Sequence, residues 1–299
     1  MNKKYIILLG LLGLMQGTAF LFIKIAVTFL NPFTIVFLRV SLALPFLLLF
    51  GIYKYKNFIY IVKPKLKLLV LLSFTSIIIP FSLISWAGKF IPSGVSAIYM
   101  ALIPIFVTIF EVKFRKNFTF SKSGYLGLFI GLIGVVSLFS NDFLVNLGSG
   151  LIGHILCFLS AIFYAFSVYK TKILSDIPPA LIGLSILTLS SFFLLPLILF
   201  FLPSSISASK FEWFSILGLA TISTAGALIL MYYLIDKVGT VFTSITNYLV
   251  PLFGLLLGYL FLNERLTPML IPAISFILLS LYLVSNGKVI SHPKEEDER

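Results

Sequence analysis

The chain consists almost entirely of apolar runs that are each long enough to cross a bilayer. There are ten runs, and as a helix rising about 1.5 Å per residue each could span ~30 Å of hydrocarbon. Of the 299 residues, 60% are hydrophobic and 11% are charged, too few polar groups to cover a soluble domain. No run shows the alternation typical of a membrane strand. The sequence therefore predicts an all-α integral membrane protein with ten transmembrane helices, at 5–28, 33–53, 66–88, 92–112, 122–140, 150–169, 179–202, 211–235, 240–262 and 267–286.

The distribution of Lys and Arg predicts how these helices are oriented. A net charge of +12 is also typical of nucleic-acid-binding proteins, but most cations lie in the connections on the N-terminal side of the membrane. The opposite connections carry only Lys89, Lys210 and Arg265. By the positive-inside rule, we expect a multi-pass protein of the cytoplasmic membrane with both termini cytoplasmic and no nucleic-acid partner.

The two halves of the chain resemble each other. SGVSAIYMALIPIF (93–106) aligns without gaps on TVFTSITNYLVPLF (240–253), which places Pro104 on Pro251 at an offset of 147 residues. This alignment predicts two five-helix repeats, 1–146 and 147–287, followed by a polar cytoplasmic tail, 288–299. Because five is odd, the second repeat must enter the membrane inverted. Inverted-topology repeats are typical of secondary transporters that work by alternating access, with the substrate site between the repeats.

Several motifs resemble the EamA-type family of the drug/metabolite transporter superfamily. They are QGTAFLFIK (16–24), NPFTIVFLR (31–39) and, most specifically, VPLFGLLLGYLFLNERLT (250–267). The resemblance implies a ten-helix, inverted-repeat carrier of small metabolites, more often an exporter than an importer. The chain departs from the family pattern at Gln16, where tryptophan is frequent, and at Asn117, which replaces the glutamate that the second repeat keeps as Glu264.

Two cations lie inside apolar runs, and both are expected in the outer third of the bilayer. Lys24 and Arg39 have no acidic residue in their own runs. Their long side chains could reach the outer interface, or they could face the cavity and attract an anionic group of the substrate. Arg39 suits a carboxylate better, because its planar fork donates two hydrogen bonds. Glu264 is a candidate partner and outer-gate residue, or only a capping residue.

Other polar and aromatic residues at depth complete the candidate substrate site. Asn247 is the strongest of them, although it could equally form an interhelical hydrogen bond. Three prolines are candidate hinges, since they free backbone carbonyls or bend helices. The full set of substrate-binding candidates is Gln16, Lys24, Arg39, Ser85, Trp86, Tyr99, Tyr232, Thr246, Asn247 and Tyr248, and the gating candidates are Pro80, Pro104, Pro251 and Glu264.

These observations favour a secondary transporter of small amphipathic metabolites, such as amino acids, that acts as an exporter. The alternatives are a non-transporting membrane scaffold or sensor, and a membrane enzyme. An enzyme would need clustered His, Asp, Glu or Cys, whereas the chain has two histidines and one cysteine. We therefore expect no catalytic residues, metal or cofactor, and the substrate and the lipid bilayer as partners. A coupling ion such as a proton, and a monomeric or homodimeric state, are left open.

Overall fold

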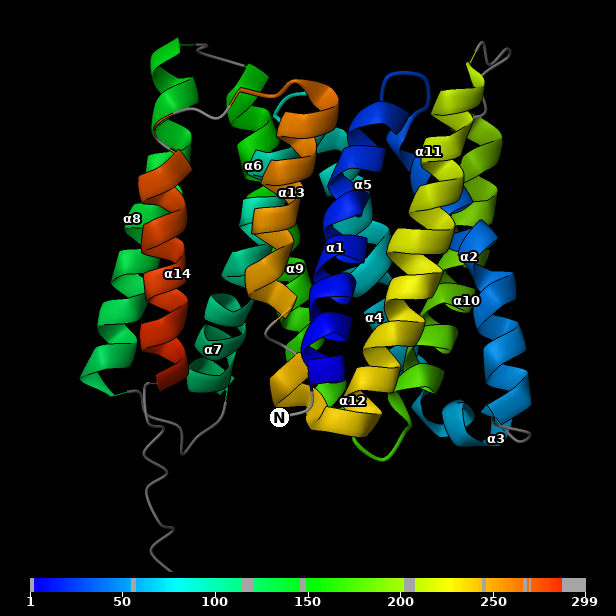
Figure 1. Ribbon diagram of the computed structural model, residues 1–299. Helices are drawn as coiled ribbons and strands as arrows, with labels where there is room; N and C mark the ends of the chain where they lie inside the picture. The colour runs from blue at the N-terminus through cyan, green and yellow to red at the C-terminus, as the bar shows by residue number, and fades with distance from the viewer. Residues whose placement is uncertain are drawn as a thin grey trace, which may run out of the picture.

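The computed structural model describes residues 3–54, 58–114, 121–145, 149–201, 208–243, 246–265, 268 and 270–286. Every regular element within these residues is helical, and the helices stand side by side in one bundle (Figure 1). This arrangement confirms the predicted all-helical class. The predicted tail, 288–299, and the side chain of Tyr248 lie outside the described residues.

The helices follow one another with short connections. The first half contains α1 (Lys3–Ala26), α2 (Pro32–Lys54), α3 (Phe58–Val62), η1 (Lys63–Lys65), α4 (Leu66–Ser73), η2 (Phe74–Ile78), α5 (Ile79–Ala87), α6 (Ser93–Tyr99), η3 (Met100–Leu102), α7 (Ile103–Phe114) and α8 (Lys122–Val145). The second half contains α9 (Ser149–Thr171), η4 (Lys172–Leu174), α10 (Pro179–Phe201), α11 (Lys210–Ala220), η5 (Thr221–Gly226), α12 (Ala227–Thr243), α13 (Thr246–Leu262) and α14 (Leu270–Asn286).

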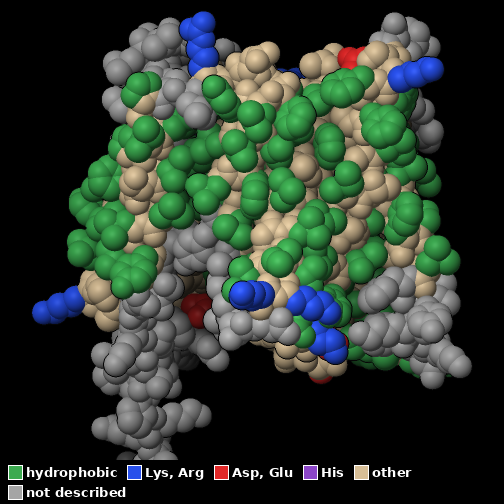
Figure 2. All heavy atoms as spheres, in the orientation of Figure 1, with side chains coloured by type: hydrophobic (Ala, Val, Ile, Leu, Met, Phe, Trp, Pro, Cys, Tyr) green, Lys and Arg blue, Asp and Glu red, His purple; other side chains and the backbone are tan. Residues whose placement is uncertain are grey.

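Seven helical stretches of the described residues are long and apolar enough to cross a membrane. Three further apolar helices are shorter, and they coincide with the predicted fifth, ninth and tenth runs: Lys122–Gly134, Leu249–Leu262 and Leu270–Ser280. Large apolar side chains are exposed on the outside of the bundle, including Phe200 at 83% and Ile271 at 73%. In Figure 2 apolar side chains cover the middle of the visible face, and lysine and arginine side chains lie toward its upper and lower edges. A soluble protein does not expose apolar surface on this scale, so the surface fits a lipid environment.

The eighth and ninth helices begin and end differently from the prediction. The predicted runs 211–235 and 240–262 leave a connection at 236–239, where Gly239 lies. In the structure α12 continues to Thr243, and α13 begins only at Thr246. Glycine lowers helix propensity by about 1 kcal/mol, which is too little to end a helix that tertiary packing holds. The connection between these helices is correspondingly short.

Two π-helical turns interrupt equivalent helices of the two halves. The turn η2 begins at Phe74, and the turn η5 begins at Thr221. These positions are 147 residues apart, the same offset that aligns Pro104 with Pro251. A π turn widens the helix by one residue and is frequent at functional sites. Both turns face the interior of the bundle, with Ser223, Thr224 and Thr75 buried.

Contacts between helices also recur when the halves are exchanged. Helix α1 packs on α13, and the equivalent α9 packs on α6 and α7. Helix α5 packs on α9, as the equivalent α12 packs on α1, while α2 contacts its own equivalent α10 and α8 contacts its equivalent α14. Such paired contacts are expected when two similar halves are related by a two-fold axis.

Candidate functional site

A cavity of about 320 Å³ lies between the two halves. Its size is at the lower end of small-molecule pockets, which measure roughly 300–1,000 Å³. Helix α1 contributes residues three or four apart, which lie on one face of a helix; these are Gln16, Ala19, Phe20 and Ile23. Most of the lining is aliphatic or aromatic. Its polar members are Gln16, Arg39, Ser76, Tyr164, Ser223, Thr224, Tyr232 and Asn247.

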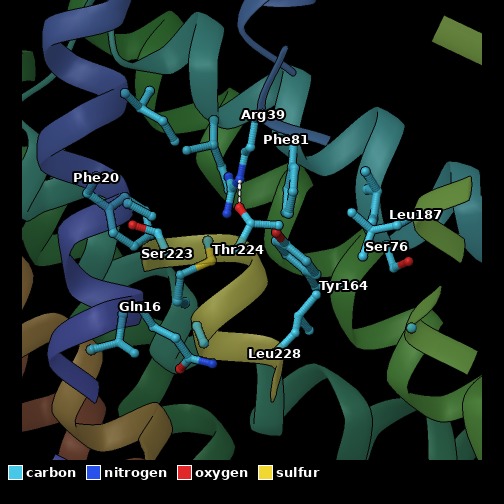
Figure 3. Close-up of a pocket in the computed structure, with 18 of the residues that line it drawn as sticks. Gln16, Phe20, Arg39, Ser76, Phe81, Tyr164, Leu187, Ser223, Thr224 and Leu228 are labelled. Carbon is cyan, nitrogen blue, oxygen red and sulfur yellow. Dashed lines mark hydrogen bonds between the residues drawn. The ribbon is translucent and has the colours of Figure 1, made fainter. Parts of the chain in front are cut away.

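Arg39 is the charged residue of this lining. It comes from α2, and only 7% of its surface is exposed. Its Nε donates a 2.7 Å hydrogen bond to Thr224 Oγ1, and its guanidinium carbon lies 3.7 Å from the centroid of the Phe81 ring. Figure 3 shows the guanidinium among Phe81, Thr224 and Phe20 inside the cavity. No acidic residue pairs with Arg39 among the described residues, so its two terminal nitrogens remain available to a ligand.

Thr224 positions the guanidinium because of the π turn. In this turn the Thr224 hydroxyl donates a 2.8 Å bond to the carbonyl of Leu219, five residues earlier. With its proton committed to Leu219, the hydroxyl oxygen presents a lone pair to the Nε of Arg39. The adjacent Ser223 shares a 2.9 Å hydrogen bond with Thr18 of α1. The turn therefore joins α2, α12 and α1 around the cavity.

Replacing Thr224 by valine is expected to lower the free energy of unfolding by about 1–3 kcal/mol, because a buried charged donor then loses its acceptor. Thr224→Ser keeps the hydroxyl and should remain close to the parent protein. The thermal unfolding midpoint of the purified protein in detergent measures both variants. Equal midpoints for the valine and serine variants would show that the Arg39–Thr224 bond does not hold the structure.

Lys24 and Glu264 lie near the end of the bundle where α1 ends, outside the cavity lining. Lys24 Nζ donates hydrogen bonds of 2.7 Å to the carbonyl of Gly88 and 2.9 Å to that of Ile91. The Glu264 carboxylate accepts from the backbone nitrogens of Ser93 and Gly94, at 2.6 and 3.1 Å, and from the Ser93 hydroxyl at 2.9 Å. A carboxylate at this position satisfies the unpaired amides that begin α6. Lys24 thus ties α1 to the α5–α6 connection, and Glu264 ties α13 to α6.

Glycines allow α13 to approach its neighbours closely at this end. A methyl group at Gly254 would overlap the side chain of Ala97 in α6. A methyl group at Gly258 would overlap the Glu264 carboxylate and the Ser93 hydroxyl. On the other side, a methyl group at Gly17 of α1 would lie 2.7 Å from Phe253 Cβ. We call the contact of Glu264 with Ser93 and Gly94 the outer latch, because the loop charges of the sequence predict that this end faces outward.

Four of the predicted substrate-binding residues line the cavity: Gln16, Arg39, Tyr232 and Asn247. The others of known placement lie elsewhere. Tyr99 is fully buried and bonds to His154 Nδ1 at 2.9 Å. Thr246 donates to the carbonyl of Thr243 at 2.7 Å. Trp86 stacks beneath Lys89, whose Nζ lies 4.9 Å from its ring, and Ser85 is buried at 1% exposure next to it in α5.

Two of the three candidate hinge prolines stand beside irregularities of the helices, and the third lies within a regular helix. Pro80 is in the first turn of α5, directly after the π turn η2. Pro104 is the second residue of α7, after the 3₁₀ turn η3, and Pro251 lies inside α13. Proline lacks the N–H of a regular helix turn, so each of these positions interrupts the backbone hydrogen bonding of its helix. Their role in gating stays a prediction.

The sequence argument left several lining residues out of the site. Tyr164 from α9, Gly183 from α10 and Ser76 from η2 belong to the cavity, as do Ser223 and Thr224. Ser223 and Thr224 were visible as polar residues in an apolar run, which is a usable signal. Nothing in the sequence, however, associates Thr224 with Arg39, which is 185 residues away. Gly183 matters because a side chain there would collide with Tyr232.

Comparison with known proteins gives consistent results across the chain. The sequence profile of the EamA-like transporter family matches residues 3–140 and 151–286. A protein of Archaeoglobus fulgidus named "Uncharacterized transporter" is 28% identical over 291 residues, which are 94% of this chain and 98% of that protein. The Escherichia coli K12 protein named "Uncharacterized inner membrane transporter YedA" is 28% identical over 203 residues, 67% of this chain and 64% of that protein. One solved crystal structure superposes on this chain with a TM-score of 0.62 and 13% identity, over 95% of this chain and 97% of the other. The two proteins therefore share the fold.

Proposed function

Because this chain belongs to the EamA-like transporter family, we propose that it is a secondary carrier that exports a small amphipathic metabolite with an anionic group, such as an amino acid or a similar compound. The observation that carries this proposal is Arg39. A buried cation without an acidic partner is costly, and such a residue inside a membrane protein marks a substrate or ion pathway. The apolar remainder of the lining suits the apolar part of the same molecule.

We further propose that the carrier crosses the cytoplasmic membrane ten times as two inverted five-helix repeats, 1–146 and 147–287, with both termini cytoplasmic. Support comes from the shared offset of the π turns, from the paired helix contacts and from the uneven distribution of loop cations. Helix α1 begins, and helix α14 ends, at the same end of the bundle (Figure 1). Transport then proceeds by alternating opening of the two ends around the cavity.

In this scheme the structure represents a state in which the outer latch is formed. Lys24 and Glu264 hold α1, α6 and α13 together at the end opposite the termini. Opening this end requires breaking charge-assisted hydrogen bonds, which are about twice as strong as neutral ones. The latch thereby prevents both ends from being open together. The three prolines and the two π turns are the positions at which we expect the helices to bend.

An unbiased export screen tests this function. Cells that express the protein and cells that express Arg39→Gln are grown side by side, and their media are compared by mass spectrometry. We expect at least one small anionic or zwitterionic metabolite to accumulate outside cells with the parent protein and not with the variant. Identical media at equal membrane expression would contradict the proposal.

A further inference from the structure

The proposed function leaves open whether the substrate is a net anion or a zwitterion such as an amino acid. The charge of the residues that line the cavity favours one of these two classes. Among the described lining residues Arg39 is the only charged one, so the lining carries a single positive charge and no negative charge. This is also a property of the sequence. The runs that line the cavity contain no Asp or Glu from residue 3 to 110, from 149 to 175, from 177 to 211, from 213 to 235 or from 237 to 263.

The acidic residues closest to these runs are engaged or exposed elsewhere. Glu264 is held by Ser93 and Gly94 in the outer latch. Glu111 pairs with Lys172, and Glu212 accepts from Ser209, with which it forms a capping box at the start of α11. Asp176 lies 3.5 Å from Lys65 Nζ, and Asp236 is exposed on α12. None of these five carboxylates lines the cavity.

An α-amino acid would therefore leave its ammonium group without a counter-ion. If its carboxylate binds the terminal nitrogens of Arg39, bond lengths of about 1.5 Å keep the ammonium within roughly 4 Å of the carboxylate oxygens, and so close to the guanidinium. The groups packed around Arg39 offer little to an ammonium. The Thr224 hydroxyl already donates to Leu219 and accepts from Arg39.

The Phe81 ring beside Arg39 does not supply an alternative. An ammonium group can bind the face of an aromatic ring, but the guanidinium already lies over the Phe81 ring, 3.7 Å from its centroid. The Tyr164 ring packs against Phe81, with their centroids 6.1 Å apart. The amide groups of Gln16 and Asn247 also line the cavity and can accept a hydrogen bond from a substrate. Figure 3 shows Gln16 well separated from Arg39, beyond Ser223.

We infer that the substrate of this cavity is a net anion, an amphipathic monocarboxylate without an amino group beside its carboxylate, and not the corresponding zwitterionic amino acid. The inference rests on the proposed function, whose substrate class it narrows. The carboxylate completes the pairing of Arg39, and the uncharged body occupies the apolar lining formed by residues such as Ile84, Met100 and Leu187. A compound with an additional ammonium group would have to remove that charge from water without gaining a counter-ion, which is costly.

Measuring the binding of three compounds that share the same apolar body and differ in their charged groups tests the inference. The compounds are 3-phenylpropionate, phenylalanine, which adds an α-ammonium, and phenethylamine, which keeps the amine and lacks the carboxylate. A second series uses 4-methylpentanoate, leucine and isopentylamine, so that the result does not depend on the size of the body. Affinities are measured on the purified full-length protein in detergent, and flux is measured on the same preparation in liposomes.

We expect the carboxylate of at least one series to bind at least about tenfold more tightly than the amino acid, because like charges placed side by side oppose binding. Arg39→Gln should reduce this ratio to about one. Lys89→Gln is the matched control, since it removes a cation that is exposed outside the cavity, and it should leave the ratio unchanged.

The outcomes separate the inference from the proposed function. Tighter binding of the amino acid, or a ratio unaffected by Arg39→Gln, would overturn the inference and leave the carrier function standing. A preference for the carboxylate without flux in liposomes would support the inference and contradict the carrier function. No binding of any of the six compounds by correctly folded protein would count against both.

Discussion

Replacing Arg39 by glutamine is expected to reduce transport of the anionic substrate by about 100-fold or more. Truncating one partner of a buried charge pair costs roughly 2–5 kcal/mol, and each 1.4 kcal/mol corresponds to about a tenfold change in affinity. In the empty cavity, however, Arg39 is a buried cation with one hydrogen bond and no acidic partner. Removing it should therefore leave the thermal unfolding midpoint unchanged or raise it, because an uncompensated buried charge destabilises the fold.

Loss of transport with an unchanged or higher unfolding midpoint distinguishes a residue that binds substrate from one that holds the structure. Arg39→Lys keeps the charge and loses the planar fork, so we expect it to retain part of the activity, with a reduction of about tenfold. Lys89→Gln should transport like the parent protein. Uptake into proteoliposomes and unfolding in detergent are measured on the same preparations. Loss of transport together with a lower unfolding midpoint would indicate that Arg39 holds the structure and that its contact with substrate is secondary.

Replacing Glu264 by alanine is expected to open the end of the bundle opposite the termini. The carboxylate accepts three hydrogen bonds from Ser93 and Gly94, and loss of a helix N-cap alone costs about 0.5–2 kcal/mol. The closed arrangement should become correspondingly less populated. A cysteine at position 23, which is buried and lines the cavity, reports the change in a Cys157→Ala background.

A membrane-impermeant thiol reagent added outside intact cells should label Ile23→Cys about ten times faster when Glu264 is alanine. Gly258→Ala should act in the same direction, because its methyl group would displace the Glu264 carboxylate. Gly10→Ala is the matched control, since a methyl group there meets nothing within 4 Å. Equal labelling in all four proteins would show that the outer latch does not close this end.

The membrane class and the positions of most helices could be predicted from the sequence, because hydrocarbon imposes the length and composition of each run independently of its neighbours. The prediction was weaker where packing against neighbouring helices determines where a helix ends or changes to a π turn. The apolar runs placed a connection at 236–239, yet α12 continues to Thr243. The π turns at Phe74 and Thr221 leave no recognisable mark in the sequence. They became visible as a pair only through the 147-residue offset.

The sequence predicted which types of residue form the candidate site better than it predicted which individual residues line the cavity. Arg39 and Lys24 looked alike in sequence, since both interrupt apolar runs. In the structure Arg39 lines the cavity, whereas Lys24 holds the carbonyls of Gly88 and Ile91. The difference depends on the rotation of α1 and α2 about their axes, which is fixed by packing. For the same reason Thr224, the hydrogen-bond acceptor of Arg39, was out of reach of an argument based on runs and spacing.

Counterflow with the purified protein tests the carrier function most directly. Liposomes containing the protein are loaded with the unlabelled anion that binds most tightly, and the labelled compound is added outside. The account predicts transient accumulation of label that saturates with concentration, is absent from protein-free liposomes and is lost with Arg39→Gln. Accumulation no greater than in protein-free liposomes, for every anionic or zwitterionic compound tested, would contradict it.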